Sequence, residues 1–442
     1  MEVTLQEMLE ARENRVLQQQ RLQREWKKPL ICFTMNIPGP VKNTPLIRRA
    51  FHYGRSILEA QMPCIMHREI LDAVTGCEAV YVVDGNAERL KRICTAIEDA
   101  TALGRLFDMD VLDIHGRKLD RSLVNGKSRD CIVCGAPGRG CASRRIHNVE
   151  QLQAAVNTMI ESHFFTMDRD TIAGLAVQSL LDEVHTTPKP GLVDRRNNGS
   201  HRDMTLETFL ASAEALGPYF GECVDIGRET AALSPAQTFN SLRRAGRDAE
   251  RTMYRATGGV NTHKGAIFTM GILCGSLGRL WRGTIADTQT LLAECGRVAA
   301  AALEADFSGL SAGTTAGERL YLTRGISGIR GEAAAGLPAV AQYGLPAFRN
   351  CLSRGYSRND AGAVALLHLI ATVEDTNLYH RGGDEGAAWA AEAAAAMLPE
   401  PSVEEIEALD EAFIRRNLSP GGCADLLAVT CFLAALEDHF EL

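Results

Sequence analysis

Two aspartates in the first part of the chain stand at a spacing that suits a metal ion. Asp108 and Asp110 lie two residues apart in a run of mainly apolar residues, which predicts a strand with both carboxylates on one face. Such a pair can share a divalent cation such as Mg2+ while a phosphate supplies the remaining oxygens. That arrangement suits nucleotidyl-type transfer; the alternative is a solvated strand end.

Cationic side chains accompany these aspartates. Arg105 precedes the same run, Lys42 follows a rigid Pro-Gly-Pro segment, and Arg55 lies further along the chain. Guanidinium groups bind phosphate oxygens through two parallel hydrogen bonds. We therefore expect these residues to bind phosphate, while the alternative for the Pro-Gly-Pro segment is a turn between a strand and a helix.

A group of sulfur and nitrogen ligands follows. Cys131, Cys134, Cys141 and His147 fall within seventeen residues of one another. Their types and spacing suit a closed tetrahedral zinc site of the structural kind. The alternative is a set of reduced thiols in a basic, Gly-rich loop.

Four polar segments interrupt the helical patterns of the second part. Lys264 lies at the start of one predicted helix, where backbone N–H groups and its ammonium group form a natural phosphate-binding site. Asp375 and Asn377 offer oxygen ligands for magnesium. The alternatives are ordinary helix connections, and helix capping alone would explain Asp425. The candidate residues are Lys189, Asp194, His201 and Asp203, then Asn261, His263 and Lys264, then Asp375, Asn377, Arg381, Gly382 and Gly383, and finally Gly421, Gly422 and Asp425.

The periodicity of apolar residues predicts two domains, residues 1–165 and residues 166–442. In the first, predicted strands at 30–35, at 79–83 and within 103–113 alternate with helices at 45–61 and 87–102, which indicates an α/β or α+β domain. The second has apolar residues at three- and four-residue spacing throughout, which indicates a large all-α domain. Its predicted helices are 171–183, 206–216, 263–280, 288–303, 362–373, 384–397, 403–415 and 424–439.

Composition narrows the class of protein. The net charge of -8 argues against general affinity for nucleic acids, which requires a basic surface. There is no apolar stretch long enough to cross a membrane and no secretory signal pattern. The thirteen cysteines are scattered, several of them in apolar helical patterns, which indicates reduced thiols. We therefore expect a cytoplasmic protein without nucleic-acid or membrane partners.

Three ordered motifs within residues 1–160 resemble the CitX family, the apo-citrate lyase phosphoribosyl-dephospho-CoA transferases. They are NIPGPVK from Asn36, GRLFDMDV from Gly104, and CIVC from Cys131 together with the stretch from Cys141 to His147. The resemblance implies that Asp108 and Asp110 hold a metal ion and that Arg105 helps to bind a triphosphate. It also implies attachment of a prosthetic group to a serine of the citrate lyase acyl carrier protein (its γ subunit), with release of diphosphate.

The polar segments of the second part resemble the CitG family, the triphosphoribosyl-dephospho-CoA synthases, over roughly residues 170–440. The motifs are PKPGLVD from Pro188, GVNTHKG from Gly259, DTN from Asp375 with RGG from Arg381, and SPGG from Ser419 with ADLL from Ala424. The resemblance implies an all-helical fold. It also implies a reaction in which ATP and 3'-dephospho-CoA give 2'-(5''-triphosphoribosyl)-3'-dephospho-CoA and adenine.

Together the two resemblances imply a bifunctional transferase that first makes the prosthetic group and then attaches it. We expect the following roles: phosphate binding by Lys189, Lys264 and Arg381, Mg2+ binding by Asp375 with Asp203, and proton transfer by His201 or His263. Three alternatives stay open. They are the equivalent assembly for malonate decarboxylase, an ATP-dependent phosphotransferase acting on a small molecule, and a non-catalytic helical scaffold for the carrier subunit.

Overall fold

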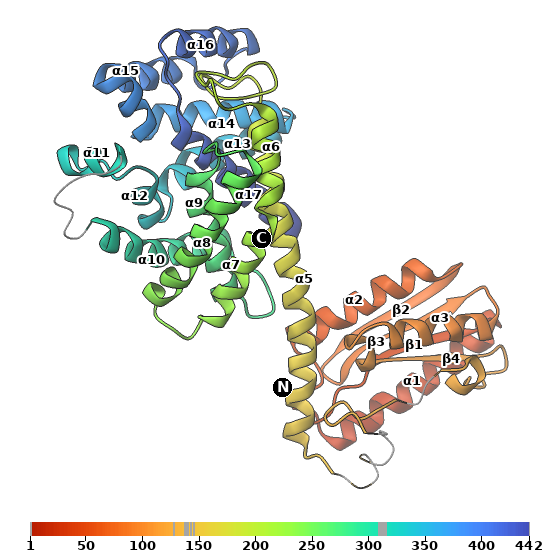
Figure 1. The fold of residues 1–442 in the computed structure, drawn as a ribbon. Helices are drawn as coiled ribbons and strands as arrows, with labels where there is room; N and C mark the ends of the chain where they lie inside the picture. Colours follow the sequence, from red (N-terminus) through yellow and green to blue (C-terminus); the bar gives the residue numbers. More distant parts are fainter. Residues whose placement is uncertain are drawn as a thin grey trace. The chain divides into compact units, whose positions relative to one another are not determined.

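The computed structural model describes residues 2–126, 129–136, 141, 144, 146–307 and 316–441. The chain divides into two compact units, Met1–Thr166 and Met167–Leu442. The division falls inside the long helix α5 (Val149–His185) (Figure 1). Each unit has a buried apolar core of its own.

The first unit is built on a four-stranded sheet with the order β2-β3-β1-β4. All its strand pairs are antiparallel. The strands are β1 (Leu30–Met35), β2 (Ile65–Ala73), β3 (Gly76–Val83) and β4 (Phe107–Leu112), and the helices are α1 (Leu5–Trp26), α2 (Pro45–Gln61) and α3 (Ala87–Ala100), with short 3-10 turns η1 (Leu103–Leu106) and η2 (Arg121–Val124). The unit is therefore α+β.

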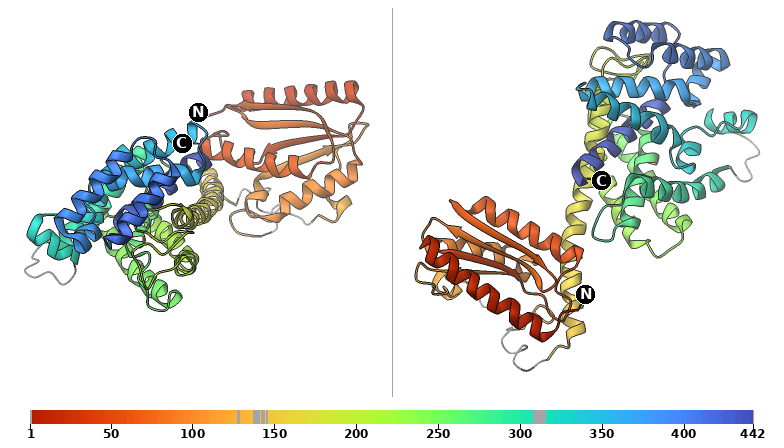
Figure 2. Two further views of the ribbon diagram at one scale, coloured as in Figure 1. Left: turned by 90° about the horizontal axis from the view of Figure 1, so that it is seen from above. Right: turned by 180° about the vertical axis from the view of Figure 1, so that it is seen from behind.

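Helices cover both faces of this sheet (Figure 2). On one face, Leu22 of α1 packs with Leu30, Cys32 and Val82. On the other, Phe51 of α2 stacks on a β1 phenylalanine with ring centroids 4.9 Å apart. Since side chains alternate along a strand, neighbouring residues of β4 face α1 and the α2–α3 layer in turn.

The predicted fold class is confirmed, but the sequence did not predict β2. Its residues include His67, Arg68 and Glu69, and only some of its side chains are even partly buried. Charged residues are common on edge strands, where they discourage pairing with other chains. They also remove the apolar alternation that would have indicated a strand.

The second unit is helical throughout its described residues, apart from the connecting segments. Helix α9 lies among α7, α8, α10 and α17, and most of its residues are buried. No described helix has the length and apolarity that a membrane crossing needs. Besides the end of α5, the helices are α6 (Leu206–Ala215), α7 (Gly217–Glu229), α8 (Pro235–Ala256), α9 (Lys264–Leu280), α10 (Thr288–Phe307), α11 (Ala316–Arg324), α12 (Gly328–Ala334), the π-helical turn η3 (Val340–Gly344), α13 (Leu345–Ser353), α14 (Arg358–Thr372), α15 (Thr376–Met397), α16 (Val403–Arg415) and α17 (Gly421–Phe440).

Two polar segments expected to be loops are partly helical. Helix α15 already begins at Thr376, with Asp375 as its N-cap, and a non-helical Gly383 (φ 63°) kinks it. Helix α17 begins at Gly421, three residues earlier than expected. Asn377 and Arg381 therefore project from a helix, as Asp425 was already expected to, so the surrounding fold restricts their positions more than a loop would.

Candidate active sites

A cavity of about 410 Å3 in the helical unit gathers residues from all four polar segments. These segments are far apart in the sequence but meet around the N-termini of α9, α15 and α17. Of the residues expected to act chemically, the cavity is lined by Lys189, His201, Asn261, His263, Lys264, Asn377, Arg381, Gly421, Gly422 and Asp425.

Lys189 forms a buried ion pair at this cavity. Its ammonium group lies 2.5 Å from Glu183 Oε1 and also donates to the Glu183 carbonyl at 2.8 Å, and the Lys189 side chain is 1% exposed. Burial raises the pKa of Glu183, although Lys189 acts to lower it. Sequence reasoning did not predict Glu183, because a carboxylate at the end of an apolar helix gives no local sign of its distant role.

Asp194 supports the segment that carries Lys189 and does not line the cavity. Its carboxylate accepts hydrogen bonds from the backbone N–H groups of Lys189 at 3.0 Å and Arg196 at 2.7 Å. A carboxylate engaged by the backbone in this way stabilises a turn. The geometry therefore favours a supporting role for Asp194 over direct ligand binding.

His201, on the first segment, contacts the third and fourth segments. Its Nε2 is 2.8 Å from Ser419 Oγ, and its Nδ1 is 3.4 Å from an Arg381 nitrogen. Burial, and then the charge of Arg381, lower the pKa of His201 to about 4. The imidazole is therefore neutral at physiological pH.

His263 is the more deeply buried histidine. Its Nδ1 lies 2.7 Å from Ser212 Oγ, while its Nε2 has no hydrogen-bond partner among the described residues. Burial, and then the charge of Lys189, lower the pKa of His263 to about 3. A neutral imidazole with one unpartnered nitrogen at a cavity wall can exchange a proton with a bound substrate.

Asp425 lies against the N-terminus of α9, where a Cβ atom at Gly265 would clash with its carboxylate. Burial, and then the nearby carboxylates of Glu183 and Asp375, raise the pKa of Asp425 well above its usual value. A divalent cation would offset this repulsion. Since Mg2+ is commonly bound by one or two carboxylates plus substrate phosphates, Asp425 with Glu183 nearby fits a magnesium–triphosphate complex.

The expected pairing of Asp375 with Asp203 at a metal ion does not fit this geometry. Asp375 is buried as the N-cap of α15, and its two oxygens accept from the backbone N–H groups of Asn377 and Cys423 at 2.7 and 2.9 Å. Asp203 is exposed, and neither residue lines the cavity. Gly382 and Gly383 do not line it either; Gly382 packs against Leu418.

The first unit has a cavity of about 890 Å3, lined by Asn36, Pro38 and Arg105 together with Cys131, Cys141 and His147. Two motifs separated by about seventy residues thus meet, because Asn36 donates its backbone N–H to the carbonyl of Leu106, next to Arg105. Arg105 itself donates to the Asp130 carbonyl.

The cysteine–histidine group has the geometry of a metal site. The ligand atoms of Cys131, Cys134, Cys141 and His147 all lie within 4.8 Å of one another. Ligands about 2.3 Å from a tetrahedral zinc ion are separated by roughly 3.8 Å. Among the residues that the structure describes, this is the one cluster of three or more His, Cys, Asp or Glu ligands.

Asp108 and Asp110 share the face of β4 that lies under α1, as their spacing indicates, but they do not line this cavity. Asp110 pairs with Lys118 at 2.5 Å, and Asp108 is close enough to Arg15 to raise the pKa of that guanidinium slightly, after the larger effect of Glu78.

The other predicted cations of this unit also lie outside the cavity. Lys42 donates to the Ile37 carbonyl at 2.5 Å, which holds its own loop. Arg55 pairs with Glu59 at 3.1 Å and contacts the Tyr81 hydroxyl. The structure therefore does not bring Lys42 or Arg55 together with Arg105.

The comparisons with known proteins cover both units. Residues 3–163 match the family described as CitX, apo-citrate lyase phosphoribosyl-dephospho-CoA transferase. Residues 169–442 match CitG, ATP:dephospho-CoA triphosphoribosyl transferase. The chain is 34% identical over 459 residues to Protein CitXG of Haemophilus influenzae, which covers 99% of this chain and 97% of that protein. The chain belongs to the CitXG family.

Other relatives agree with this membership. Protein CitXG of Leuconostoc mesenteroides subsp. cremoris is 31% identical over 458 residues, 98% of this chain and 97% of that protein. The 2-(5''-triphosphoribosyl)-3'-dephosphocoenzyme-A synthase of Pectobacterium atrosepticum is 40% identical over 289 residues, 64% of this chain and 95% of that protein. As a CitXG member, the chain is a transferase with two activities, and it serves synthesis of the citrate lyase prosthetic group.

Proposed function

We propose that the helical unit joins ATP to 3'-dephospho-CoA and releases adenine. The observation that carries the proposal is the cavity in which cations, buried carboxylates and two neutral histidines converge from four separate segments. In the reaction, the 2'-hydroxyl oxygen of dephospho-CoA forms a bond to C1' of the ATP ribose. The bond from C1' to N9 of adenine breaks, and adenine leaves with the bonding electron pair and takes up one proton, which balances the proton that the hydroxyl loses. The triphosphate stays on the product.

The residues of the cavity divide this work. The unpartnered Nε2 of His263 accepts the hydroxyl proton, because neutral imidazole is available as a base at neutral pH. Lys264 and Arg381 bind phosphate oxygens. Buried carboxylates favour the positive charge that develops on the ribose as adenine leaves. Magnesium, which Asp425 and Glu183 would hold, neutralises triphosphate charge when bound.

The test is incubation of the purified chain with ATP, Mg2+ and dephospho-CoA. We expect stoichiometric adenine and a product whose mass equals dephospho-CoA plus a triphosphoribosyl group, both measured by liquid chromatography and mass spectrometry. Release of ADP or AMP without adenine would rule out this reaction and favour a phosphotransferase. Tight carrier binding without any nucleotide turnover would favour a scaffold.

We further propose that the first unit transfers phosphoribosyl-dephospho-CoA to a serine of the citrate lyase acyl carrier protein. The serine oxygen forms the new bond to phosphorus, and diphosphate leaves. The match of residues 3–163 to the CitX family and the position of Arg105 at the large cavity support this proposal. Asp108 and Asp110, which the resemblance to that family assigns to metal binding, lie outside this cavity on the face of β4 under α1. Mass spectrometry of the carrier protein before and after reaction tests it, with the malonate decarboxylase carrier as the comparison substrate.

The cysteine–histidine cluster is proposed to bind structural zinc, because its four ligand atoms all lie within 4.8 Å of one another and are of the types that a structural zinc site uses. We expect the purified chain to contain about one zinc ion per molecule by plasma mass spectrometry. Replacing Cys134 with Ser should remove most of it. Replacing Cys64, an exposed cysteine outside the cluster, should not. Equal zinc in the two variants, or none in the original chain, would contradict the site.

A further inference from the structure

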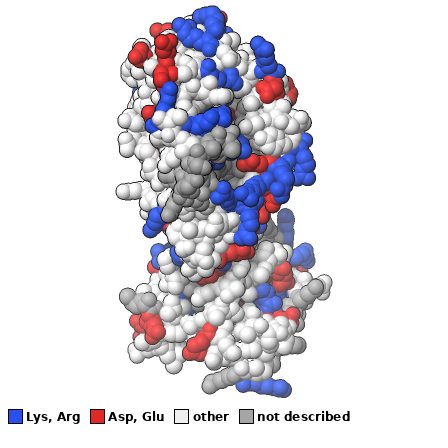
Figure 3. Space-filling model, turned by 60° about the vertical axis from the view of Figure 1, so that its left-hand side comes forward, with Lys and Arg blue, Asp and Glu red and all other residues white. Residues whose placement is uncertain are grey.

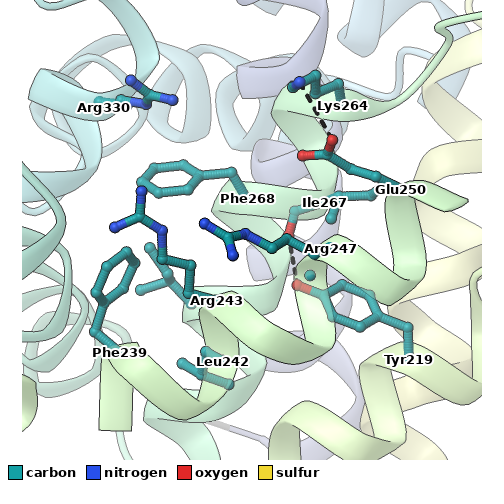
Figure 4. A pocket seen from close by; sticks show the side chains of 12 residues that line it. Tyr219, Phe239, Leu242, Arg243, Arg247, Glu250, Lys264, Ile267, Phe268 and Arg330 are labelled. Carbon is teal, nitrogen blue, oxygen red and sulfur yellow. Dashed lines mark hydrogen bonds and ion pairs between the residues drawn. The ribbon is translucent and has the colours of Figure 1, made fainter. Parts of the chain in front are cut away.

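A second cavity of about 250 Å3 lies in the helical unit beside the first. One face of α8 forms a wall, with residues at three- and four-residue spacing that include Phe239, Arg243 and Arg247. Residues of α7, α9 and α12 complete the lining. Figure 4 shows the guanidinium groups of Arg243, Arg247 and Arg330 turned toward the space beside Phe268. Pockets for whole drug-sized ligands are generally larger than this, so the cavity fits part of a substrate.

This cavity combines positive charge with an apolar floor. Arg243, Arg247, Lys264 and Arg330 line it, whereas Glu250 is its one carboxylate among the described residues. Glu250 lies 3.2 Å from Lys264, and cationic side chains outnumber carboxylates among the lining residues that the structure describes. The apolar lining includes Phe239, Leu242, Phe268 and Ile272. The side of the unit that Figure 3 brings forward also carries several groups of Lys and Arg side chains.

The two cavities meet at the start of α9. Lys264 lines both of them. On α12, Ile329 lines the first cavity and its neighbour Arg330 lines the second. A ligand whose reacting end lies in the first cavity can therefore extend a side arm into the second.

The chemistry of the proposed reaction requires two such places. Its product carries two polyphosphate arms, the triphosphate from ATP and the diphosphate of dephospho-CoA, which continues into the pantetheine chain. The first cavity has the buried carboxylates that suit a magnesium–triphosphate complex. The second has arginines, which bind phosphate oxygens without a metal ion, beside apolar side chains that suit an aliphatic chain.

Resting on the proposed function, we propose that the second cavity binds the diphosphate of dephospho-CoA and the adjoining part of its pantetheine arm. This assigns Arg243, Arg247 and Arg330 to the recognition of one substrate only. These arginines would allow the enzyme to distinguish dephospho-CoA from ATP, although both substrates contain an adenosine group.

The test replaces Arg247 with Ala. We expect KM for dephospho-CoA to rise about tenfold to a hundredfold, as for loss of hydrogen bonds to a charged group, while KM for ATP changes less than about twofold. Arg247→Lys should recover part of the loss, because it restores the charge without the guanidinium. Arg251→Ala is the matched control, since Arg251 lies on the same helix, is largely exposed and pairs with Asp248.

Equilibrium binding of dephospho-CoA to the same variants makes the result independent of turnover. A rise in KM for ATP alone would assign the cavity to the triphosphate and overturn the proposal. Unchanged binding in a folded Arg247→Ala variant would also overturn it. The original chain could bind dephospho-CoA without releasing adenine, and Arg247→Ala could weaken that binding. In that case the proposed reaction would be wrong, whereas the proposed binding site would be supported.

Discussion

Replacing Lys189 with Met is expected to lower the free energy of unfolding of the helical unit by about 3–5 kcal/mol. The ammonium group is paired with Glu183 at 2.5 Å, and both side chains are almost fully buried. Removing the lysine leaves an unpaired carboxylate in an apolar environment, and burying an uncompensated charge is costly. Chemical denaturation followed by circular dichroism measures the change.

A double replacement separates stability from function. Lys189→Met combined with Glu183→Leu should recover most of the lost stability, because a buried ion pair can often be exchanged for apolar groups at little cost. Adenine release should be absent in this folded double variant, since the cavity then lacks both a cation and a carboxylate. The matched control is Arg415→Met, which removes an exposed pair with Glu411 and should cost less than about 1 kcal/mol. If Lys189→Met lowered the free energy of unfolding by a similarly small amount, the expected stabilising effect of the buried ion pair would be wrong.

Replacing Asp108 and Asp110 together with Asn should lower the rate of carrier loading by about a hundredfold to a thousandfold, the usual loss when an electrostatic contact to the reacting group is removed. Adenine release should change less than about twofold, because these residues belong to the first unit. The measurements are carrier mass for the first activity and adenine release for the second.

The two aspartates lie near cationic side chains of their own unit, so they could serve only to stabilise the strand. The same experiment distinguishes that structural role from a role in carrier loading. Asp110 pairs with Lys118, and exposed pairs of this kind contribute little to stability. If the pair only stabilises the strand, the double variant should load the carrier normally. Asp84→Asn is the matched control, since Asp84 forms an exposed ion pair with Lys28 outside the proposed site. Loss of both activities would mean that the two units do not act separately.

The sequence was sufficient for the fold class because its signals were local. Apolar residues at a period of two or of three to four residues predicted β1, α2 and most helices of the second unit, and the structure agrees. Strand β2 was missed because its residues carry the charges of an edge strand. The early starts of α15 and α17 were missed because glycines and polar residues at a helix N-terminus resemble a loop.

The candidate site was less accessible from sequence. Lys264 and Arg381 could be chosen because they stand in polar, Gly-rich segments, and the structure brings them to one cavity. To decide which carboxylates act at the cavity, one must know how deeply each side chain is buried and which residues surround it. The amino-acid sequence does not give this information. Asp375 and Asp425 look alike in sequence, yet the first caps α15 with its oxygens engaged and the second faces the cavity.

The close approach of Asp425 to the start of α9 joins two distant positions of the chain. A methyl group at position 265 would occupy the space that the Asp425 carboxylate fills. A larger residue can therefore be accommodated at 265 only if the acid at 425 is lost or displaced. Although the glycine and the aspartate lie 160 positions apart, we expect the two positions to covary. Related sequences that keep Gly265 should also keep Asp425.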